Sequence, residues 1–179
     1  MSNSHKVVNV VIAGLGGQGV IKASDVLADA AFLAGHDAKK SEIHGMSQRG
    51  GSVASDVRFG ENVLSPMVPS GEADYLAVLD PGQVENNRHH ISRGGMLIEP
   101  RILLGEAKSA KALDKDDSTP LNSRNFNIAM LGALSTHLDI PQEHWESAIR
   151  KNLPEKLHEQ NFEVFALGRE RAQAAKQPT

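Results

Sequence analysis

The amino-acid sequence predicts an α/β domain whose sheet is mostly parallel. Short apolar runs rich in Val and Ile alternate along the chain with segments of helical periodicity, which is typical of a sheet covered by helices. A glycine-rich turn joins the first apolar run to the first helical segment. The 179 residues contain no internal repeat or long linker, and this length suits one domain. We therefore expect a single domain over residues 1–179, with loosely ordered ends at residues 1–5 and 172–179.

The N-terminal part of the chain predicts a strand, a glycine turn and a helix, which is a Rossmann-like beginning. Residues 6–13 are apolar at nearly every position, as in a central parallel strand that is covered on both faces. Apolar residues then recur at spacings of three and four over residues 20–34, and Gly35 stands where helices commonly end. We expect a mostly parallel Rossmann-like sheet with helices on both faces.

The remaining segments continue this alternation of strands and helices. The other predicted strands cover residues 37–43, 52–59, 73–79 and 96–99. Gly94 and Gly95 indicate a turn before the last strand. The other predicted helices cover residues 81–91, residues 127–137, a segment from Pro141 onward, and the middle of residues 154–175. Asp80 is the expected N-cap of the first of these, and residues 127–137 indicate an amphipathic helix. Residues 105–124 carry mixed charges and follow no clear period.

Composition excludes several classes of function. Without a cysteine, the chain holds no disulfide, no thiolate-bound iron–sulfur cluster, no thiolate zinc site and no cysteine nucleophile. A formal charge of −3 and only five Phe, one Tyr and one Trp give no reason to expect a nucleic-acid partner. No apolar run approaches the ~20 residues of a membrane-spanning helix, and no secretion signal is visible. We expect a cytoplasmic protein with neither nucleic-acid nor membrane partners.

The first candidate site is the glycine turn after the first strand. It consists of Gly14, Leu15, Gly16, Gly17, Gln18 and Gly19. The G-x-G-x-x-G spacing between a strand and a helix suits an anion at the helix N-terminus, and it also suits a turn that only lets strand and helix pack closely. A dinucleotide site further needs an acidic residue ~20 positions on, at the end of the second strand. Asp37 and Glu42 are the candidates, although Asp37 lies at the start of that strand.

The second candidate site is a polar loop that follows the second predicted strand. It consists of Glu42, Ile43, His44, Gly45, Met46, Ser47, Gln48, Arg49, Gly50 and Gly51. His44 is able to exchange a proton near neutral pH, and Arg49 is able to form a forked contact with a phosphate or carboxylate. The density of polar groups beside glycines favours a ligand or subunit contact over a loop that satisfies its own polar groups.

Motifs of several enzyme classes are missing. No G-K-[ST] follows the glycine turn, so the sequence does not indicate a phosphate-binding P-loop. Neither H-E-x-x-H nor G-x-S-x-G occurs, which leaves a zinc protease and a serine hydrolase without support. His89 and His90 are interpreted as a solvated helix end rather than a metal site, because adjacent helical residues do not face one point.

Three strings together resemble the gamma-type subunits of the 2-oxoacid:ferredoxin oxidoreductase family. They are residues 14–19, residues 42–51, and Val57 with Arg58. Within that family the likeness is nearest to the small, or beta, subunits of the indolepyruvate-type enzymes. It continues more weakly through residues 73–74, 127–132 and 161–168. The H-G-M-S-Q-R-G-G string is the specific part, whereas the glycine turn alone occurs in many folds.

The resemblance implies a division of labour between subunits. Enzymes of this family decarboxylate a 2-oxoacid on thiamine diphosphate with Mg²⁺, pass electrons through iron–sulfur clusters to ferredoxin, and transfer the acyl group to coenzyme A. The present chain lacks a G-D-G…N-N thiamine motif and any cysteine. We therefore expect a non-redox subunit that alone binds no cofactor or metal, holds no catalytic residue and has no turnover. Its expected partner is the large thiamine- and cluster-binding subunit, and a homodimer in isolation stays open.

The resemblance also implies a role for both loops. It places them on the coenzyme A side of the enzyme or against the partner subunit, through Gly14, Gly16, Gly17, Gln18, Gly19, Glu42, His44, Ser47, Gln48, Arg49, Gly50 and Gly51. Two alternatives stay open at this point. One is a free-standing Rossmann-like oxidoreductase that uses NAD or FAD, and the other is a pure docking module.

Overall fold

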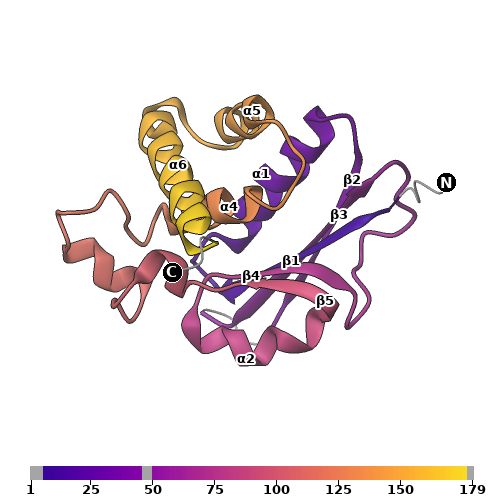
Figure 1. Cartoon of the computed structure of the whole chain (residues 1–179), viewed down its shortest axis with the longest axis horizontal. Helices are drawn as coiled ribbons and strands as arrows, with labels where there is room; N and C mark the ends of the chain where they lie inside the picture. The colour runs from indigo at the N-terminus through magenta and orange to yellow at the C-terminus, as the bar shows by residue number, and fades with distance from the viewer. Residues whose placement is uncertain (1–5, 46–49, 177–179) are drawn as a thin grey trace.

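Five strands form one sheet in the computed structural model, which describes residues 6–45 and 50–176. They are β1 (Val8–Leu15), β2 (Asp37–His44), β3 (Ser52–Gly60), β4 (Ala73–Val78) and β5 (Ile91–Ile98), in the spatial order β2-β3-β1-β4-β5 (Figure 1). β1 pairs in parallel with β4, and β4 with β5, whereas β3 is antiparallel to both β1 and β2. β3 alone opposes the direction shared by the other strands, so the predicted mostly parallel α/β sheet is confirmed.

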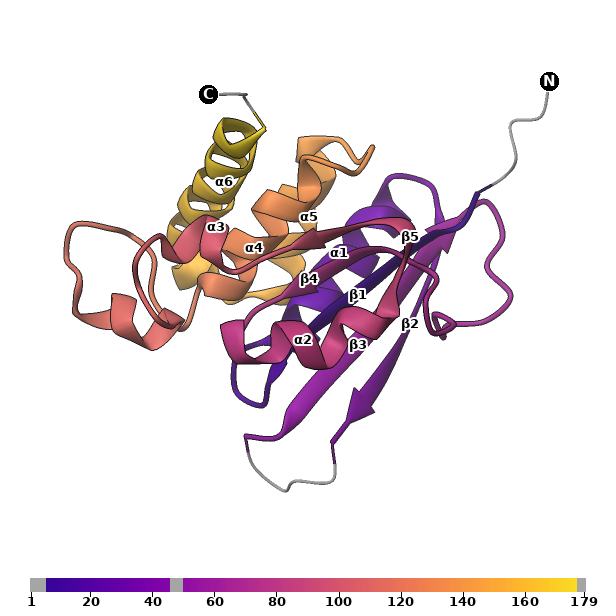
Figure 2. The same ribbon diagram turned by 60° about the horizontal axis from the view of Figure 1, so that its bottom comes forward.

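Helices cover the two faces of this sheet unequally (Figures 1 and 2). One face carries α1 (Val20–Leu33), α4 (Phe126–Ser135), α5 (Gln142–Asn152) and α6 (His158–Ala175). The other face carries the short α2 (Val84–Asn87) between the 3-10 turns η1 (Pro81–Gln83) and η2 (Arg88–His90). The connections hold α3 (Arg101–Leu104), η3 (Ala110–Lys115) and η4 (Glu155–Leu157). A large apolar cluster lies under the four long helices and a smaller one under α2, which confirms helices on both faces.

The position of β2 differs from a Rossmann sheet. There the second strand would lie in parallel beside the first, but here β2 and β3 form an antiparallel hairpin whose register runs from Asp37↔Gly60 to His44↔Val53. β3 then pairs with β1 along its whole length, so β2 becomes the edge of the sheet. The end of β2 is therefore separated from the glycine turn by an intervening strand.

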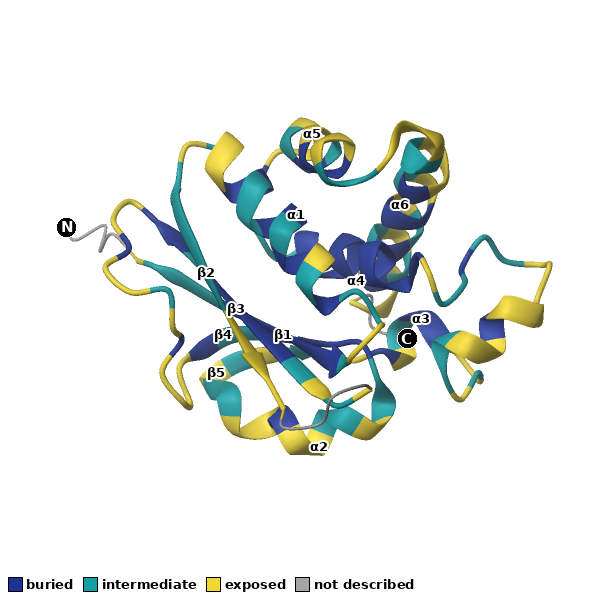
Figure 3. Cartoon of the chain, turned by 180° about the vertical axis from the view of Figure 1, so that it is seen from behind, coloured by how far each residue is buried: buried dark blue, intermediate teal, exposed yellow. Residues whose placement is uncertain are grey.

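The prediction that α4 is amphipathic is wrong. All ten of its residues are buried (Figure 3). α6 packs along one side of α4, and α1 and the sheet contact it as well, so no face of the helix is left for solvent. Gly132 and Gly168 permit the close approach of α4 to α6, since a Cβ on either would lie within about 2 Å of a backbone oxygen of the other helix.

Two further predictions are wrong, one about a turn at two glycines and one about where the ordered part of the chain ends. Gly94 and Gly95 do not form a turn but lie inside β5, where the pairing with β4 is irregular. A Cβ on Gly95 would lie 2.5 Å from the Ala73 carbonyl oxygen, so the close strand approach requires glycine there. The chain end is also ordered further than expected. α6 continues to Ala175, Ala172 is buried, and the Lys176 ammonium donates to the Thr136 carbonyl at 3.2 Å. Residues 1–5 and 177–179 lie outside the described chain.

A buried carboxyl group and a partly buried imidazole lie on the α2 side of the sheet. The Asp56 side chain on β3 is buried, and its Oδ2 accepts a hydrogen bond from the Val68 amide at 2.8 Å. Burial raises the pKa of Asp56 and lowers the pKa of His90, although the attraction between the two groups, and that of Arg58 for Asp56, opposes these shifts. His89 lowers the pKa of His90 further. Within the described chain, Asp56 Oδ1 and His90 Nδ1 have no hydrogen-bond partner.

These pKa shifts predict how stability depends on pH. As the pH falls below about 6.5, the unfolded chain takes up the proton that His90 resists in the fold, so the free energy of unfolding should decrease. His90→Gln should make this decrease shallower. Asp56 acts in the opposite sense, because the folded chain protonates this carboxylate at a higher pH than the unfolded chain does, which favours the fold in acid. Asp56→Asn removes this contribution and should make the free energy of unfolding fall more steeply as the pH decreases. Urea unfolding between pH 7 and pH 4 tests both, and equal slopes in all three proteins would contradict the prediction.

Candidate functional site

The glycine turn between β1 and α1 is held in shape by a side chain of its own. The Gln18 Oε1 accepts a hydrogen bond from the Leu15 amide at 2.8 Å, and the Gln18 amide donates to the Leu15 carbonyl at 3.1 Å. Gly17 and Gly19 both have left-handed backbone conformations, with φ values of 89° and 80°. Among the residues that the structure describes, no side chain caps α1 and no acidic residue lies in its first turn, so these residues leave its N-terminal amides open to an anion.

Gln18 also fastens the turn to the carboxyl end of β4. Its Nε2 donates to Asp80 Oδ2 at 2.8 Å, and Asp80 Oδ1 accepts from the Gly82 amide at 2.8 Å. Asp80 is thus the N-cap of η1, as the sequence predicts, and both of its carboxylate oxygens have donors. This link fixes the position of the glycine turn relative to the crevice between β1 and β4.

The glycine turn and the second candidate loop touch each other. The Gly16 amide donates to the Gly51 carbonyl at 2.9 Å, and a Cβ on Gly16 would lie 3.2 Å from the Gly50 amide nitrogen. The two loops therefore meet at the carboxyl edge of the sheet. Ser47, Gln48 and Arg49 of the second loop lie outside the described residues.

Glu42 and His44 lie at the end of β2, and Glu42 is already engaged. The Lys40 ammonium contacts Glu42 Oε1 at 2.6 Å and Asp25 Oδ1 of α1 at 2.5 Å. The His44 Nε2 lies 3.6 Å from Glu42 Oε2. The hydrogen bond from Lys40 lowers the pKa of Glu42. The Glu42 carboxylate is therefore occupied by its neighbours on β2, and it does not line the pocket beside the glycine turn.

A pocket of about 430 Å³ opens beside the glycine turn. Its lining comes from the turn, from the end of β4 and from the segment before α4, and it includes Gly16, Gly17, Gln18, Gly50, Asp80, Ser109, Lys111, Ser123, Arg124 and Phe126. The chain leaves β1 toward β2 over the α1 face and leaves β4 toward β5 over the α2 face (Figure 2). This divergence makes the crevice between β1 and β4 a topological switch point, where open α/β sheets bind ligands.

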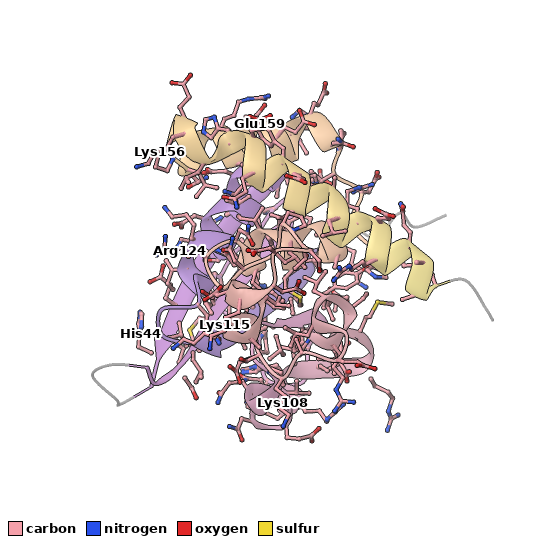
Figure 4. All side chains as sticks on the ribbon, turned by 90° about the vertical axis from the view of Figure 1, so that its left-hand side faces the viewer. His44, Lys108, Lys115, Arg124, Lys156 and Glu159 are labelled. Carbon is pink, nitrogen blue, oxygen red and sulfur yellow. The ribbon has the colours of Figure 1, made fainter. Side chains whose placement is uncertain are left out.

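Two cations that the sequence pattern did not single out line this pocket. The exposed side chains of Lys111 and Arg124 form no hydrogen bond or ion pair with any other described residue. Asp114 fastens the intervening segment, because its carboxylate accepts from the Ser123 amide at 2.6 Å and from the Ser123 hydroxyl at 2.8 Å. These hydrogen bonds lower the pKa of Asp114. The positive charges of Arg124 and Lys111 lower the same pKa further, but weakly. Figure 4 shows Arg124 on the same side of the molecule as His44 and Lys115.

The position of β2 removes the basis for a dinucleotide site. An acidic residue at the end of β2 would have to reach a ribose beside the glycine turn, but β3 lies between β2 and β1. Asp37 lies at the opposite end of β2 and is bound to Lys39 at 2.8 Å. No group of three or more acidic, histidine or cysteine side chains in the described chain is placed to hold a metal, and no described helix is long and apolar enough to cross a bilayer.

Comparison with known proteins identifies the class of protein that this fold and site define. The chain belongs to the pyruvate ferredoxin/flavodoxin oxidoreductase family, whose model matches residues 9–171. It is 34% identical to indolepyruvate oxidoreductase subunit IorB of Thermococcus kodakarensis, over 91% of this chain and 95% of that relative. It is 31% identical to 2-oxoglutarate synthase subunit KorC of Archaeoglobus fulgidus, over 96% and 91% of the two chains.

Solved structures agree with this assignment. The gamma subunit of a keto/oxoacid ferredoxin oxidoreductase from Geobacter sulfurreducens superposes with a TM-score of 0.77 at 25% identity, covering 96% of this chain and 99% of that one. A 2-oxoglutarate:ferredoxin oxidoreductase from Magnetococcus marinus has the same fold, with a TM-score of 0.77 at 21% identity over 94% of this chain and 31% of that longer chain. The chain is thus a small subunit of a 2-oxoacid:ferredoxin oxidoreductase, which confirms the resemblance and not the free-standing dehydrogenase.

Proposed function

We propose that this chain is the non-redox subunit of a thiamine-diphosphate-dependent oxidoreductase for aryl 2-oxoacids such as indolepyruvate, and that its pocket binds the phosphate-bearing part of coenzyme A. The observation that carries the proposal is the pocket beside the glycine turn, which is lined by Lys111 and Arg124, neither of which forms an ion pair with another described residue. The preference for an aryl substrate rests on four relatives named indolepyruvate oxidoreductase subunit IorB, with identities of 34%, 31%, 30% and 31%.

The chemistry of the pocket fits a phosphate ester. Gly16 and Gly17 carry no side chain, so a phosphate oxygen is able to approach the backbone amides at the start of α1. The Gly16 and Gln18 amides of the turn are already engaged with the Gly51 and Leu15 carbonyls and do not take part. Arg124 is suited to a forked contact with phosphate, and Lys111 supplies a point charge. Among the described residues, Asp80 is the one acid in the lining, and each of its carboxylate oxygens already accepts a hydrogen bond, Oδ2 from Gln18 and Oδ1 from Gly82. A volume of about 430 Å³ lies within the range of pockets that hold part of a small-molecule ligand.

The role of this chain in the reaction is binding and orientation. Coenzyme A, when bound, supplies the thiol that accepts the acyl group. The residues of this chain would hold its phosphates, and thereby position the thiol toward a partner chain that carries thiamine diphosphate, Mg²⁺ and the iron–sulfur clusters. The Magnetococcus marinus enzyme, part of which shares this fold, was solved with 2-oxoglutarate, coenzyme A and succinyl-CoA bound. Without cysteine, this chain holds no thiolate-bound cluster and has no turnover alone.

Arg124→Ala and Lys111→Ala should each raise the KM for coenzyme A in the assembled enzyme. Loss of a charge-assisted hydrogen bond costs about 1.5–3 kcal/mol, which corresponds to roughly a 10- to 100-fold increase. The KM for the 2-oxoacid and kcat at saturating coenzyme A should stay unchanged, because the cations contribute equally to ground-state and transition-state binding. Steady-state kinetics of the enzyme reconstituted with its large subunit measures all three, with the isolated chain as the blank.

Lys108→Ala provides the matched control, because Lys108 lies on the same segment but does not line the pocket. It should leave the KM for coenzyme A as in the unmodified enzyme. Variants of Lys111 and Arg124 that weaken subunit assembly without changing this KM would instead support a pure docking module. An unchanged KM together with intact assembly would reject the pocket as the coenzyme A site.

A further inference from the structure

Two stretches of the chain that lie far apart in the sequence line the pocket beside the glycine turn, and they differ in chemistry. The first is the turn itself, whose residues 14–19 carry no charged side chain. The second is the stretch over residues 109–126, which contributes Lys111 and Arg124. The pocket therefore offers an anion two kinds of contact, with backbone amides from one stretch and with cationic side chains from the other.

Lys111 and Arg124 are placed to reach one common anion. Both line the same pocket, and the positive charges of both act on the same carboxylate, that of Asp114. The Asp114 oxygens already accept hydrogen bonds from the amide and the hydroxyl of Ser123. The side chains of the two cations form no hydrogen bond or ion pair with another described residue. Their charged ends are therefore available to the same ligand group.

The backbone that carries these two cations is fixed. The Arg124 amide donates to Asn122 Oδ1 at 2.9 Å, and the Asn122 amide donates to Asn125 Oδ1 at 2.9 Å. Asn125 is buried, and so is Leu113, which follows Lys111 by two residues. An anion that binds here has to order two side chains but no backbone, which limits the entropic cost of binding.

Carboxylates do not neutralise the two cations inside the pocket. Among the described lining residues Asp80 is the one acid, and its oxygens already accept hydrogen bonds from Gln18 and Gly82. Residues 105–124 hold four further acids, none of which lines the pocket, namely Glu106, Asp114, Asp116 and Asp117. The described lining thus presents two unbonded cations and one occupied carboxylate, which favours a ligand group that carries more than one negative charge.

Coenzyme A carries phosphate in two chemically different places. Each phosphate of its diphosphate is esterified and holds a single negative charge, whereas its 3′-phosphate is a monoester with about −1.5 to −2 charges at pH 7 and three terminal oxygens. The monoester matches two cations that reach one group, and the diphosphate suits backbone amides at a helix start behind a glycine turn. The remaining lining is apolar, which suits the adenosine between the two phosphate-bearing parts, and consists of Leu15, Leu79, Ala110 and Phe126.

We propose that Lys111 and Arg124 bind the 3′-phosphate of coenzyme A and so make the enzyme select coenzyme A over its 3′-dephospho form, an inference that rests on the proposed function. In the enzyme reconstituted with its large subunit, the KM for 3′-dephospho-coenzyme A should exceed the KM for coenzyme A roughly 10-fold or more. In the double variant Lys111→Ala/Arg124→Ala the two KM values should be about equal, because the ligand and the protein changes remove the same contact. Both side chains are exposed, so the melting temperature of the double variant should match that of the unmodified chain.

Two comparison variants and one binding measurement sharpen this test. Lys108→Ala removes a cation of the same segment that does not line the pocket, and it should keep the preference for coenzyme A. Gly19→Ala disturbs the start of α1, and it should raise both KM values by the same factor because both acceptors carry the diphosphate. Calorimetric titration of the reconstituted enzyme should show adenosine 3′,5′-bisphosphate binding roughly 10-fold or more tightly than adenosine 5′-monophosphate, and the double variant should bind the two about equally.

Three results would overturn the inference. The first is an unmodified enzyme that uses both acceptors with the same KM. The second is a double variant that keeps the full preference for coenzyme A, because another part of the enzyme would then hold the 3′-phosphate. The third is a double variant in which both KM values rise by the same factor, because the cations would then bind the diphosphate. The third result leaves the pocket as the coenzyme A site, whereas KM values that do not change at all would reject the proposed function as well.

Discussion

Gly168→Ala is expected to destabilise the fold more than any exposed substitution, because it separates two helices at their closest point. A Cβ at this position of α6 would lie 1.9 Å from the Ala129 carbonyl oxygen of α4 and 3.1 Å from the Ala133 amide nitrogen. The reciprocal contact is at Gly132 of α4, where an added Cβ would lie 2.1 Å from the Phe165 carbonyl oxygen of α6. The opposing atoms are backbone, so they are unable to rotate away and the helices must move apart.

The size of the effect follows from what the separation exposes. α4 is wholly buried, and Val164 and Phe165 of α6 belong to the same large apolar cluster. Overpacking costs about 1–3 kcal/mol and occasionally more, while the better helix propensity of alanine returns about 1 kcal/mol. A contact below 2 Å with backbone lies at the upper end of this range, so we expect a net loss of about 2 kcal/mol and a melting temperature lower by roughly 6 °C.

Gly94→Ala is the control for this prediction. Gly94 lies in β5, where an added Cβ would have nothing within 4 Å. The Gly94→Ala variant replaces a glycine without creating a steric contact. Its melting temperature should stay within about 2 °C of that of the unmodified chain. Equal melting temperatures of the Gly168→Ala and Gly94→Ala proteins would show that α4 and α6 separate at little cost. That outcome would contradict the close packing described above.

Local patterns in the sequence predicted the parts of the site that local chemistry decides. The strand, glycine turn and helix of residues 8–33 follow from hydrophobic period and from the conformations that Gly17 and Gly19 permit. The sequence marked both loops as candidate sites, and the hydrogen bond between Gly16 and Gly51 joins them in the structure. Asp80 as an N-cap was likewise a local prediction, since the Asx side chain bonds an amide two residues on.

Features that depend on distant parts of the chain were not predictable from these patterns. The sequences of β2 and β3 are strand-like, but they do not show whether the two strands pair with each other as a hairpin or belong to separate crossover units. The structure pairs them as a hairpin, and β3 also pairs with β1, so β3 separates β2 from β1. Lys111 and Arg124 lie in a segment without a period, which reaches the glycine turn because Asp114 binds Ser123. α4 was predicted to be amphipathic, but its residues are apolar on nearly every side, and α6 covers the face that would have been solvated.

Gly19→Ala is expected to cost both stability and ligand affinity, because two separate effects coincide at this residue. Gly19 has a φ of 80°, which costs an alanine about 1–2 kcal/mol. An added Cβ would also lie 2.4 Å from the Asn127 Nδ2 and 2.9 Å from its Cγ. Asn127 is buried and donates to the Gly19 carbonyl at 3.1 Å, so its displacement adds about 1–3 kcal/mol.

Gly35→Ala separates the two effects. Gly35 also has a positive φ, 93°, but an added Cβ there would have nothing within 4 Å. It should show the backbone cost alone, so Gly19→Ala should be destabilised further by the amount that Asn127 contributes. In an Asn127→Ala background this excess should disappear, because the atoms nearest the new Cβ are removed. Urea unfolding of the single and double variants measures the coupling as a double-mutant cycle.

The assembled enzyme distinguishes loss of stability from loss of the site. Gly19 precedes the first turn of α1, and its carbonyl accepts the first helical hydrogen bond, from Ala23, at 2.9 Å. A shift of this residue therefore moves the amides that border the pocket. We expect Gly19→Ala to raise the KM for coenzyme A several-fold, and Gly35→Ala, at the far end of α1, to leave it unchanged although it lowers stability. Equal KM values in the two variants would mean that the N-terminus of α1 takes no part in binding coenzyme A.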